Sequence, residues 1–353
     1  MTRFAWAQFR PQALVGVGGL VVVAVVLAVT GPHLAHVYAT NVANCSAHRD
    51  CATVSAALAQ TDKSLRTWLG ALVIVVPALI GMFWGAPLVA AELETGTYRL
   101  VWAQSVTRTR WLATKLGVVG LASMAVAGLL SLIVTWWASP VDRASMNVFG
   151  TFDQRDIVPV GYAAFAFALG VSAGALARRV TPAIATTLVS FVVARVAFSQ
   201  LVQPHLIGPV LRHLALNPAT TGYGSSGLLL FGSGPATLEP SAPDIPNAWV
   251  ISIQIVDKAG RALSSKVLKD NCPLLGQGGP GTAGGHSNGP APAGAVQVLR
   301  DCVDRLGATH HELVAYQPAS RYWALQWYEL AIYLAATLVL GASCVWWVRR
   351  RLA

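Results

Sequence analysis

Two carboxylates stand directly after a long apolar run of this chain. Glu92 and Glu94 follow the apolar segment 69–91, and Gly96 comes shortly after them. Where a chain leaves a membrane, such carboxylates can accept hydrogen bonds or pair with Arg99 or Arg108. Gly96 permits a sharp turn. The chemistry that this spacing indicates is therefore binding and positioning.

The residues around the acids predict a short helix with one apolar face. Leu93, Thr97, Leu100 and Val101 are spaced i, i+4, i+7 and i+8, which places them on one side of a helix. Such a face either contacts a partner protein or lies among lipid headgroups. The spacing alone leaves these two interpretations open.

A charged residue interrupts the apolar segment 183–203. Arg195 lies near the middle of that segment, where insertion scales assign a charge an unfavourable free energy of about 2.5–3.5 kcal/mol. In one interpretation Arg195 lines a translocation path with Ser199 and Gln200 and attracts an anionic or polar substrate group. In the other it pairs with Glu329 or with lipid headgroups and fixes helix packing.

Motifs for catalysis are weak in this sequence. The strongest candidate residues for a catalytic or metal site are His310, His311 and Glu312. The His-Glu-x-x-His spacing of a zinc site and the Gly-x-Ser-x-Gly nucleophile motif are both missing. No catalytic residue and no metal ligand is therefore predicted, and a membrane-embedded enzyme is the weaker alternative.

The composition predicts that these residues lie in or beside a membrane. Hydrophobic residues make up 54% and charged residues 11% of 353 positions, which is too apolar for a water-soluble domain. A bilayer crossing needs about 20 apolar residues, and these runs lack the alternating pattern of a barrel strand. We therefore expect an all-α polytopic membrane protein. Six segments are long enough: 13–30, 69–91, 116–138, 157–177, 183–203 and 328–348.

Basic residues predict the orientation of these spans. Lys and Arg cluster before the first span, between the second and third, between the fourth and fifth, and at the end of the chain. Because basic residues are retained on the cytoplasmic side, both termini are expected in the cytoplasm. The net charge of +10 reflects this topology and contact with membrane lipid, so nucleic acid is not an expected partner.

Four cysteines fall in the loops that this topology places outside the cell. Cys45 and Cys51 lie in the first exterior loop, and Cys272 and Cys302 lie in the last one. An oxidising exterior favours disulfides, and neither pair has the spacing of a metal site. We therefore predict two local disulfides.

The spans divide the chain into four predicted segments. Residues 204–327 are expected to form a small extracellular α/β domain, with a strand at Trp249 to Val256. One helical face there contains Leu299, Cys302, Val303 and Leu306 and ends at Gly307. Residues 1–12 have the aromatic and basic mixture of an interfacial amphipathic helix, and Pro11 is expected to turn the chain into the first span. The other segments are 13–203, with spans 1–5 and the loop 92–115, and 328–353, with span 6 and a basic tail.

One stretch of the chain resembles a known family. Residues 91–117, AELETGTYRLVWAQSVTRTRWLATKLG, resemble the loop between the second and third spans of type-2 ABC exporter permeases. That family shows Glu-x-Glu-x-Gly-Thr, a short helix, Ser/Thr-Arg and a Lys that opens the next span. The corresponding residues here are Glu92, Glu94, Gly96, Thr97, Thr107, Arg108 and Lys115, with Val106 in place of the usual Pro. The segment Tyr316 to Leu330 is similar to a subgroup with a large last extracellular loop.

The resemblance implies a function and partners. In this family the loop corresponding to 92–115 docks on a separate ATPase, which implies that the coupling residues are Glu92, Glu94, Gly96, Thr97, Leu100, Val101 and Arg108. ATP and Mg are expected only in that partner, because the chain has no Gly-x-x-x-x-Gly-Lys-Ser/Thr phosphate loop. The implied complex has two permease chains, identical or related, and two ATPase subunits in a cell membrane. It would export a hydrophobic or amphipathic small molecule or a lipid. The composition, with few Lys beside abundant Ala, Val, Gly and Arg, indicates a bacterial source.

A membrane sensor is the main alternative to an exporter. It would use the same architecture, with an extracellular domain that binds a partner and passes ATPase-driven motion outward. ATPase activity stimulated by a candidate substrate favours export, whereas stimulation only by an exterior protein favours the sensor.

Overall fold

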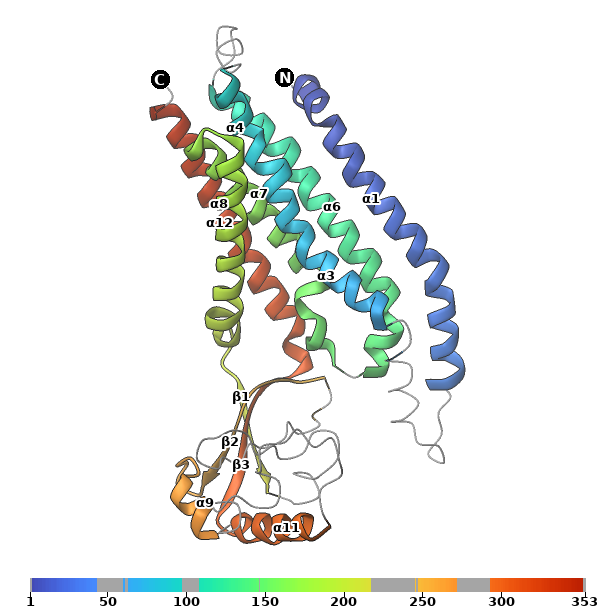
Figure 1. The fold of residues 1–353 in the computed structure, drawn as a ribbon, viewed down its shortest axis with the longest axis vertical. Helices are drawn as coiled ribbons and strands as arrows, with labels where there is room; N and C mark the ends of the chain where they lie inside the picture. Colours follow the sequence, from blue (N-terminus) through green and yellow to red (C-terminus); the bar gives the residue numbers. More distant parts are fainter. Residues whose placement is uncertain are drawn as a thin grey trace. The chain divides into compact units, whose positions relative to one another are not determined.

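A computed structural model gives the fold of residues 2–42, 60, 63–96, 108–145, 147–216, 245, 247–271 and 293–351. The chain divides into two compact units (Figure 1). The helical unit is Met1–Ile207 with Ser320–Ala353, and the sheet unit is Gly208–Ala319. Each unit has a hydrophobic core of its own.

Within the described residues, six helices are long and apolar enough to cross a membrane. Each contains one of the six predicted spans, which confirms the mostly helical, six-span fold. These helices extend over Phe9–Thr40, Lys63–Thr95, Arg110–Ala144, Val148–Ala177, Val180–His205 and Ala319–Arg350.

Most of these helices are built from consecutive elements. The first is α1 (Thr2–Val37) with η1 (Tyr38–Val42), and the second is α3 (Lys63–Ile80) with η2 (Gly81–Gly85) and α4 (Ala86–Thr95). The third is α6 (Arg108–Ser145), and the fourth is η3 (Val148–Gln154) followed by α7 (Val158–Ala177). The fifth is α8 (Val180–Ala197) with η4 (Phe198–Val202) and η5 (Gln203–His205), and the sixth is η6 (Ala319–Arg321) with α12 (Tyr322–Arg351).

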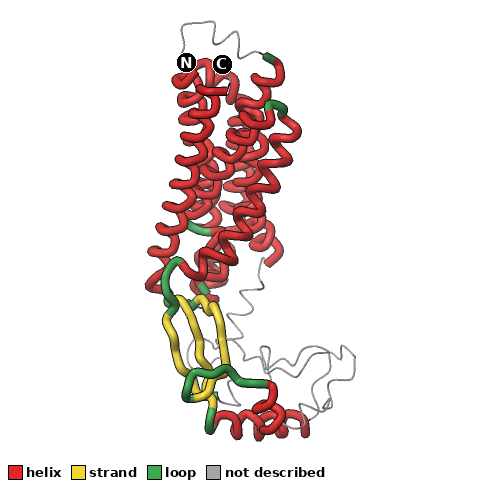
Figure 2. The backbone as a smooth tube through the Cα atoms, turned by 90° about the vertical axis from the view of Figure 1, so that its left-hand side faces the viewer, coloured by secondary structure: helices red, strands yellow, loops and turns green. Residues whose placement is uncertain are grey.

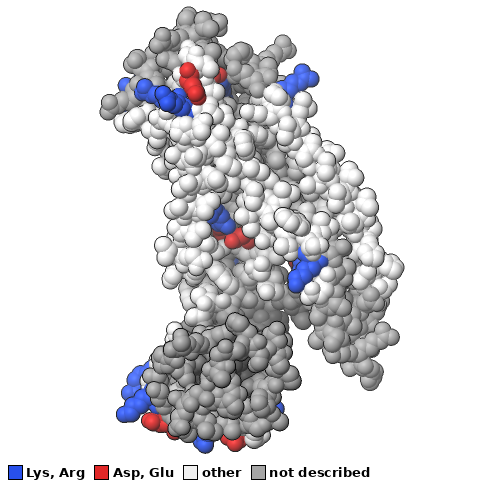
Figure 3. All heavy atoms as spheres, viewed as in Figure 1, with Lys and Arg blue, Asp and Glu red and all other residues white. Residues whose placement is uncertain are grey.

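The helices expose apolar side chains on their outer faces. α1 exposes Leu14, Val15 and Val22, and α8 exposes Val189 and Val193. Figure 3 shows the visible flank of the helical unit as largely uncharged, with charged atoms in a few separate spots. An apolar surface of this extent is far larger than a soluble monomer exposes, so lipid is its natural surrounding.

α7 is the central helix of the helical unit. It packs against α3, α4, α6, α8 and α12, and Figure 1 shows it among them. Its sequence is apolar on all sides, and Tyr162, Ala163, Ala164 and Ala166 are all buried. A helix with this pattern belongs in the interior of a bundle.

Glycines let η2 approach α7 closely. A Cβ atom at Gly81 would lie 2.6 Å from the carbonyl oxygen of Ala166, and a Cβ atom at Gly170 would overlap the backbone of Gly81. Close approach of two backbones through small residues is a common way for membrane helices to pack. The second span is therefore held tightly against the central helix.

The first span differs from its prediction at the N-terminal end. α1 continues through Pro11 without a break, so the turn predicted between an interfacial helix at 1–12 and the span is wrong. A proline within a helix removes one backbone hydrogen bond, and membrane helices tolerate this loss. Packing favours the continuous helix, because Phe9 is 2% exposed and the centre of its ring lies 4.8 Å from the centre of the Trp84 ring, with the two ring planes nearly perpendicular.

The sheet unit contains a three-stranded antiparallel sheet in the order β1–β3–β2. Figure 2 shows the three strands side by side in yellow. They are β1 (Val210–Ala215), β2 (Trp249–Asp257) and β3 (His310–Gln317), and the helices are α9 (Ser265–Asn271) and α11 (Ala293–Gly307). The core of the unit contains Leu216, Ile255, Leu268, Cys302, Val303 and Leu306.

The sheet unit agrees in part with the sequence. The strand predicted at Trp249 to Val256 is β2, and the predicted helical face that ends at Gly307 belongs to α11. β1 and β3 were not predicted from the sequence. β3 is the middle strand, although its polar N-terminal residues His310 and His311 do not resemble those of a central strand.

The described part of the chain leaves both predicted cysteine pairings untested. Cys302 is 1% exposed and disulfide-bonded, but its predicted partner Cys272 lies outside the described residues, as do Cys45 and Cys51. Cys344, in the last span, is a buried free cysteine.

Candidate functional site

The end of α4 is the first of two polar sites in the helical unit. Gly96 ends this helix with a backbone φ of 73°, in the left-handed region that glycine adopts without strain. The chain therefore leaves the second span by a sharp turn directly after the two acids. The ends of α1 and α12 that carry the termini lie at this same end of the helical unit (Figures 1 and 2).

Glu92 connects α4 to the third span. Its carboxylate forms an ion pair with the ammonium group of Lys115 on α6. The Lys115 side chain is 4% exposed and its nitrogen lies 4.8 Å from the centre of the Trp111 ring. Because the pair is largely shielded from water, removing one partner would leave a buried charge uncompensated.

Glu94 connects α4 to the fifth span. Its Oε2 accepts a hydrogen bond of 2.9 Å from the backbone nitrogen of Val180, the first residue of α8. The N-cap residue Arg179 makes no side-chain cap bond of its own. The first backbone N–H groups of a helix lack partners within it and favour a negative charge. Glu94 therefore supplies a cap for α8 from a different helix.

The rest of the predicted coupling segment is not described. Thr97, Leu100 and Val101 lie outside the described residues, and Arg108 is the first residue of α6, with its side chain outside them. The predicted apolar face therefore stays a prediction. The structure brings together Glu92, Glu94 and Gly96 at one helix end.

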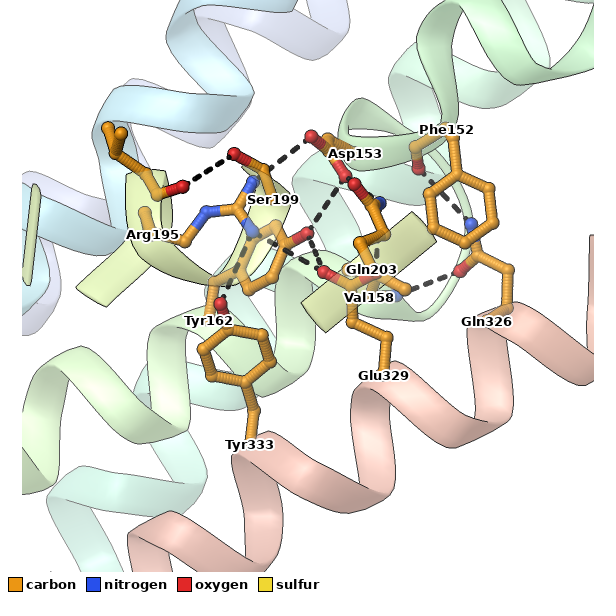
Figure 4. A network of polar contacts seen from close by, with 11 residues as sticks. Phe152, Asp153, Val158, Tyr162, Arg195, Ser199, Gln203, Gln326, Glu329 and Tyr333 are labelled. Atoms are coloured by element: carbon orange, nitrogen blue, oxygen red, sulfur yellow. Dashed lines mark hydrogen bonds and ion pairs between the residues drawn. The ribbon is translucent and has the colours of Figure 1, made fainter. Parts of the chain in front are cut away.

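Arg195 is the centre of the second polar site, the Arg195 network shown in Figure 4. Its Nη2 atom lies 3.2 Å from Asp153 Oδ2, and its Nη1 atom lies 3.3 Å from Glu329 Oε1. Nη1 also donates to the hydroxyl oxygen of Tyr333 at 3.3 Å. The guanidinium carbon lies 3.7 Å from the centre of the Tyr162 ring. The charge in the middle of the fifth span is thus fully engaged by protein groups.

Two further polar side chains bridge the carboxylates. The hydroxyl oxygen of Tyr162 lies 2.5 Å from Glu329 Oε1 and 3.1 Å from Asp153 Oδ1. Nε2 of Gln203 donates to Asp153 Oδ1 at 3.1 Å and to Glu329 Oε2 at 3.2 Å. The network therefore joins η3, α7, α8, η5 and α12.

A neighbouring set of bonds holds η3 in place. Nε2 of Gln326 on α12 donates to the carbonyl oxygen of Phe152 at 3.1 Å, and its Oε1 accepts from the backbone nitrogen of Val158 at 3.2 Å. The Tyr322 hydroxyl donates to Asp156 at 2.5 Å. These bonds fix the segment that carries Asp153 against the last span.

The sequence identified part of this network. The structure contains the proposed contact of Arg195 with Glu329, whereas Gln200 is exposed and Gln203 contributes instead. Asp153, Tyr162 and Gln203 were not predicted as members of this network. The available signal was a polar residue at the end of an apolar run, because such groups need partners when buried.

The bonds at both sites hold helices in position. Among the described residues, no group of three or more His, Cys, Asp or Glu side chains is placed to hold a metal ion. In the sheet unit, Nδ1 of His213 lies 2.8 Å from Nε2 of His311. Glu312, next to His311, is 5% exposed, and burial raises its pKa.

Comparison with known proteins identifies the family. The model of the family described as ABC-2 membrane transporter related matches residues 17–203. The matched segment includes both acids at the end of α4 and the fifth span with Arg195. No curated protein and no solved structure is significantly similar to the chain. The chain belongs to the ABC-2 membrane transporter related family and is a multi-pass membrane protein of the type-2 ABC permease kind.

Proposed function

We propose that the chain is the permease subunit of an ATP-driven exporter. It moves a hydrophobic or amphipathic small molecule or a lipid out of the cytoplasm or the inner leaflet. The energy comes from a separate ATPase that docks on the loop 92–115. The observation that carries this proposal is the pair of links at the end of α4, where Glu92 is bonded to α6 and Glu94 is bonded to α8.

These links supply a mechanical route from the loop into the bundle. ATP binding draws the ATPase subunits together and moves the docked loop. Because Glu92 and Glu94 connect the start of the loop to two other helices, α4, α6 and α8 move with it. The bundle then changes between inward-facing and outward-facing arrangements, as packed helices shift between discrete states.

The proposed orientation puts the end of the helical unit that carries the termini in the cytoplasm. Arg10, Arg110, Arg178 and Arg349 lie near the ends of spans that meet there, as expected from the retention of basic residues on the cytoplasmic side. Residues 204–327 are then extracellular. The predicted disulfides fit that oxidising side of the cell membrane.

The active complex contains more than this chain. Two permease chains, identical or related, enclose the substrate path, and two ATPase subunits bind ATP and Mg. ATP hydrolysis belongs to those subunits, since the phosphate-binding motif is missing from this sequence. Membrane lipid surrounds the exposed apolar faces.

Arg195 is proposed to fix helix packing. Its guanidinium group already contacts two carboxylates and Tyr333 and is covered by the Tyr162 ring. A substrate group would have to displace these partners. The packing interpretation therefore agrees better with the contacts than a direct role in substrate binding.

A sensor is the second candidate function. The observation that favours it is the sheet unit, which has its own core and is large for a loop between two spans. A unit of this kind can bind an exterior partner and respond to motion of the fifth and sixth spans, because it is inserted between them.

Reconstitution tests the proposal. The full-length chain is purified with its ATPase and placed in lipid vesicles, and vanadate-sensitive ATP hydrolysis is measured with fluorescent lipids and amphipathic dyes. Export predicts stimulation by at least one probe and its ATP-dependent movement across the bilayer. Stimulation only by added exterior protein supports the sensor, and failure of the chain to associate with any ATPase contradicts both.

A further inference from the structure

The hydrogen atoms of the Arg195 network can be counted from its contacts. The Tyr162 hydroxyl oxygen lies within hydrogen-bond distance of both Glu329 Oε1 and Asp153 Oδ1. A phenol has one hydrogen to donate. If both carboxylates were ionised, one of these two contacts would join two oxygens with no hydrogen between them. A second hydrogen is therefore needed, and only a carboxyl group can supply it.

The charges of the Arg195 network also indicate one additional proton. Arg195 is the one cation among the described residues of the network, and it faces the two carboxylates of Asp153 and Glu329. Two ionised carboxylates would leave one negative charge uncompensated within a membrane span, which is strongly unfavourable. One added proton makes the network neutral.

Neighbouring acids do not change this balance. Asp156 accepts from the hydroxyl of Tyr322 at 2.5 Å, and Asp142 pairs with Arg155 at 3.3 Å. Tyr333, on the same helix as Glu329, accepts from Arg195. The groups that face Glu329 from η3, α7, α8 and η5 are therefore those already counted.

Burial decides which carboxyl group holds the proton. The Glu329 side chain is 0% exposed, whereas the Asp153 side chain is 31% exposed. Water solvates an ionised Asp153 in part but does not reach Glu329, and an isolated buried charge is the more costly of the two. The proton therefore belongs on Glu329, and Asp153 remains the counterion of Arg195.

We propose that Glu329 is a proton-binding site that is occupied in this conformation. Glu329 Oε1–H donates to the Tyr162 oxygen, and the Tyr162 hydroxyl hydrogen is donated to Asp153 Oδ1. Gln203 gives one amide hydrogen to each acid, and Arg195 donates to both. Every contact then has one hydrogen.

The arrangement also gives the proton a route. Tyr162 accepts from the buried Glu329 and donates to the partly exposed Asp153, so a shift of both hydrogens moves one proton between the two acids without any side chain leaving its place. Release of the proton would leave a second anion where α7, α8 and α12 meet. The protonation of Glu329 is thus tied to how these helices pack.

Infrared spectroscopy of the full-length chain in lipid nanodiscs tests the proposal. A protonated carboxyl group has a carbonyl absorption separate from that of carboxylates, and it shifts in D₂O. We expect this band near neutral pH in Glu312→Gln, which lacks the buried acid of the sheet unit, and its loss when Glu329→Gln is added to Glu312→Gln. A band that persists in the double variant, or is absent from Glu312→Gln, overturns the proposal.

Thermal unfolding supplies a second readout. Glu329→Gln keeps an N–H donor toward Tyr162 and an oxygen acceptor toward Gln203, so its unfolding midpoint is expected to stay close to that of the wild type. Asp153→Asn removes the anion that balances Arg195 and is expected to lower the midpoint clearly. If Glu329→Gln unfolds as readily as Asp153→Asn or fails to accumulate, Glu329 is the ionised partner and the proposal is wrong.

Discussion

The two polar sites of the helical unit connect helices in different ways. At the end of α4, Glu92 pairs with Lys115 on α6, and Glu94 accepts a hydrogen bond from Val180 on α8 and is itself exposed. In the Arg195 network, five side chains from separate elements bond to one another, and Glu329 is fully buried. A bond between two helices can transmit a displacement from one to the other and reform afterwards, whereas a network of shared partners holds several helices in one arrangement. We therefore call the bonds of Glu92 and Glu94 the lever of the bundle, and the Arg195 network its joint.

The largest expected effect is at the joint. Arg195→Leu leaves the Asp153 carboxylate without its cation inside a membrane span, and breaking a buried pair in this way costs about 3–5 kcal/mol. We expect less folded protein in the membrane and a lower unfolding midpoint, measured by fluorescence-detected chromatography after heating. Gln200→Leu, on the same helical segment, is the control and should behave as the wild type. Normal stability with impaired transport in Arg195→Leu would instead indicate that Arg195 contacts substrate.

The next largest effect is expected at the Glu92–Lys115 ion pair of the lever. Lys115→Met removes the cation that faces Glu92, and a loss near the lower end of that range, about 3 kcal/mol, is expected because the Glu92 side chain keeps 12% exposure. Chemical denaturation of the purified chain measures it. Lys63→Met, at an exposed lysine of α3, is the matched control. Equal stability of the two variants would show that the link is not important for the fold.

Loss of the exposed hydrogen bond from Val180 to Glu94 is expected to change the stability of the fold less than the coupling of ATP hydrolysis to transport. Glu94→Ala removes the cap of α8, which typically costs about 0.5–2 kcal/mol. ATP hydrolysis in the complex should continue while substrate-dependent stimulation falls. Glu94→Gln retains an oxygen acceptor for the Val180 N–H and should be affected less. Unchanged stimulation in Glu94→Ala would mean that motion reaches the bundle by another route.

The smallest expected effect is on the stability of the sheet unit, which contains neither of the two polar sites. Burial raises the pKa of Glu312 above its ordinary value of 4.5, so the folded unit binds this proton more tightly than the unfolded chain does. The free energy of unfolding should therefore fall as pH rises from about 4.5 through the higher pKa of the folded state. Hydrogen exchange of β3 peptides in the full-length chain measures this trend, and Glu312→Gln should remove it. A variant with the same pH dependence would exclude Glu312 as its source.

Asp257 provides an internal contrast within the same unit. Hydrogen bonds from Arg261 and Ala259 lower its pKa below 3.8. Its stabilising contribution is present above that ordinary value and is lost as pH falls through the lower pKa of the folded state. The two acids therefore act in separate pH ranges and with opposite sign.

The sequence predicts local properties of this fold better than its cross-helix contacts. The six spans follow from runs of apolar residues, and the turn at Gly96 follows from the missing side chain. The bond from Val180 to Glu94 joins residues 86 positions apart. It depends on how two helices lie beside each other, and no pattern within either helix specifies that.

The Arg195 network shows the same limit. A charge within a span requires a partner, so the sequence leads to Glu329 as one possibility. The roles of Asp153, Tyr162 and Gln203 depend on the rotation of α7 and on the position of η3 against α12. The continuous α1 has a related cause, because the packing of Phe9 against Trp84 outweighs the local preference of Pro11 for a turn.

The most direct test measures motion across the proposed lever. Spin labels are placed at the exposed positions Val22 on α1, outside the group of α4, α6 and α8, and Leu188 on α8, and their separation is measured in the reconstituted complex before and after addition of ATP with vanadate. We expect a change of separation in the wild type that is strongly reduced by Glu94→Ala, while the ATPase stays bound. An equal change in both proteins, or none in the wild type with an active ATPase bound, would contradict the proposed transmission of motion through Glu94.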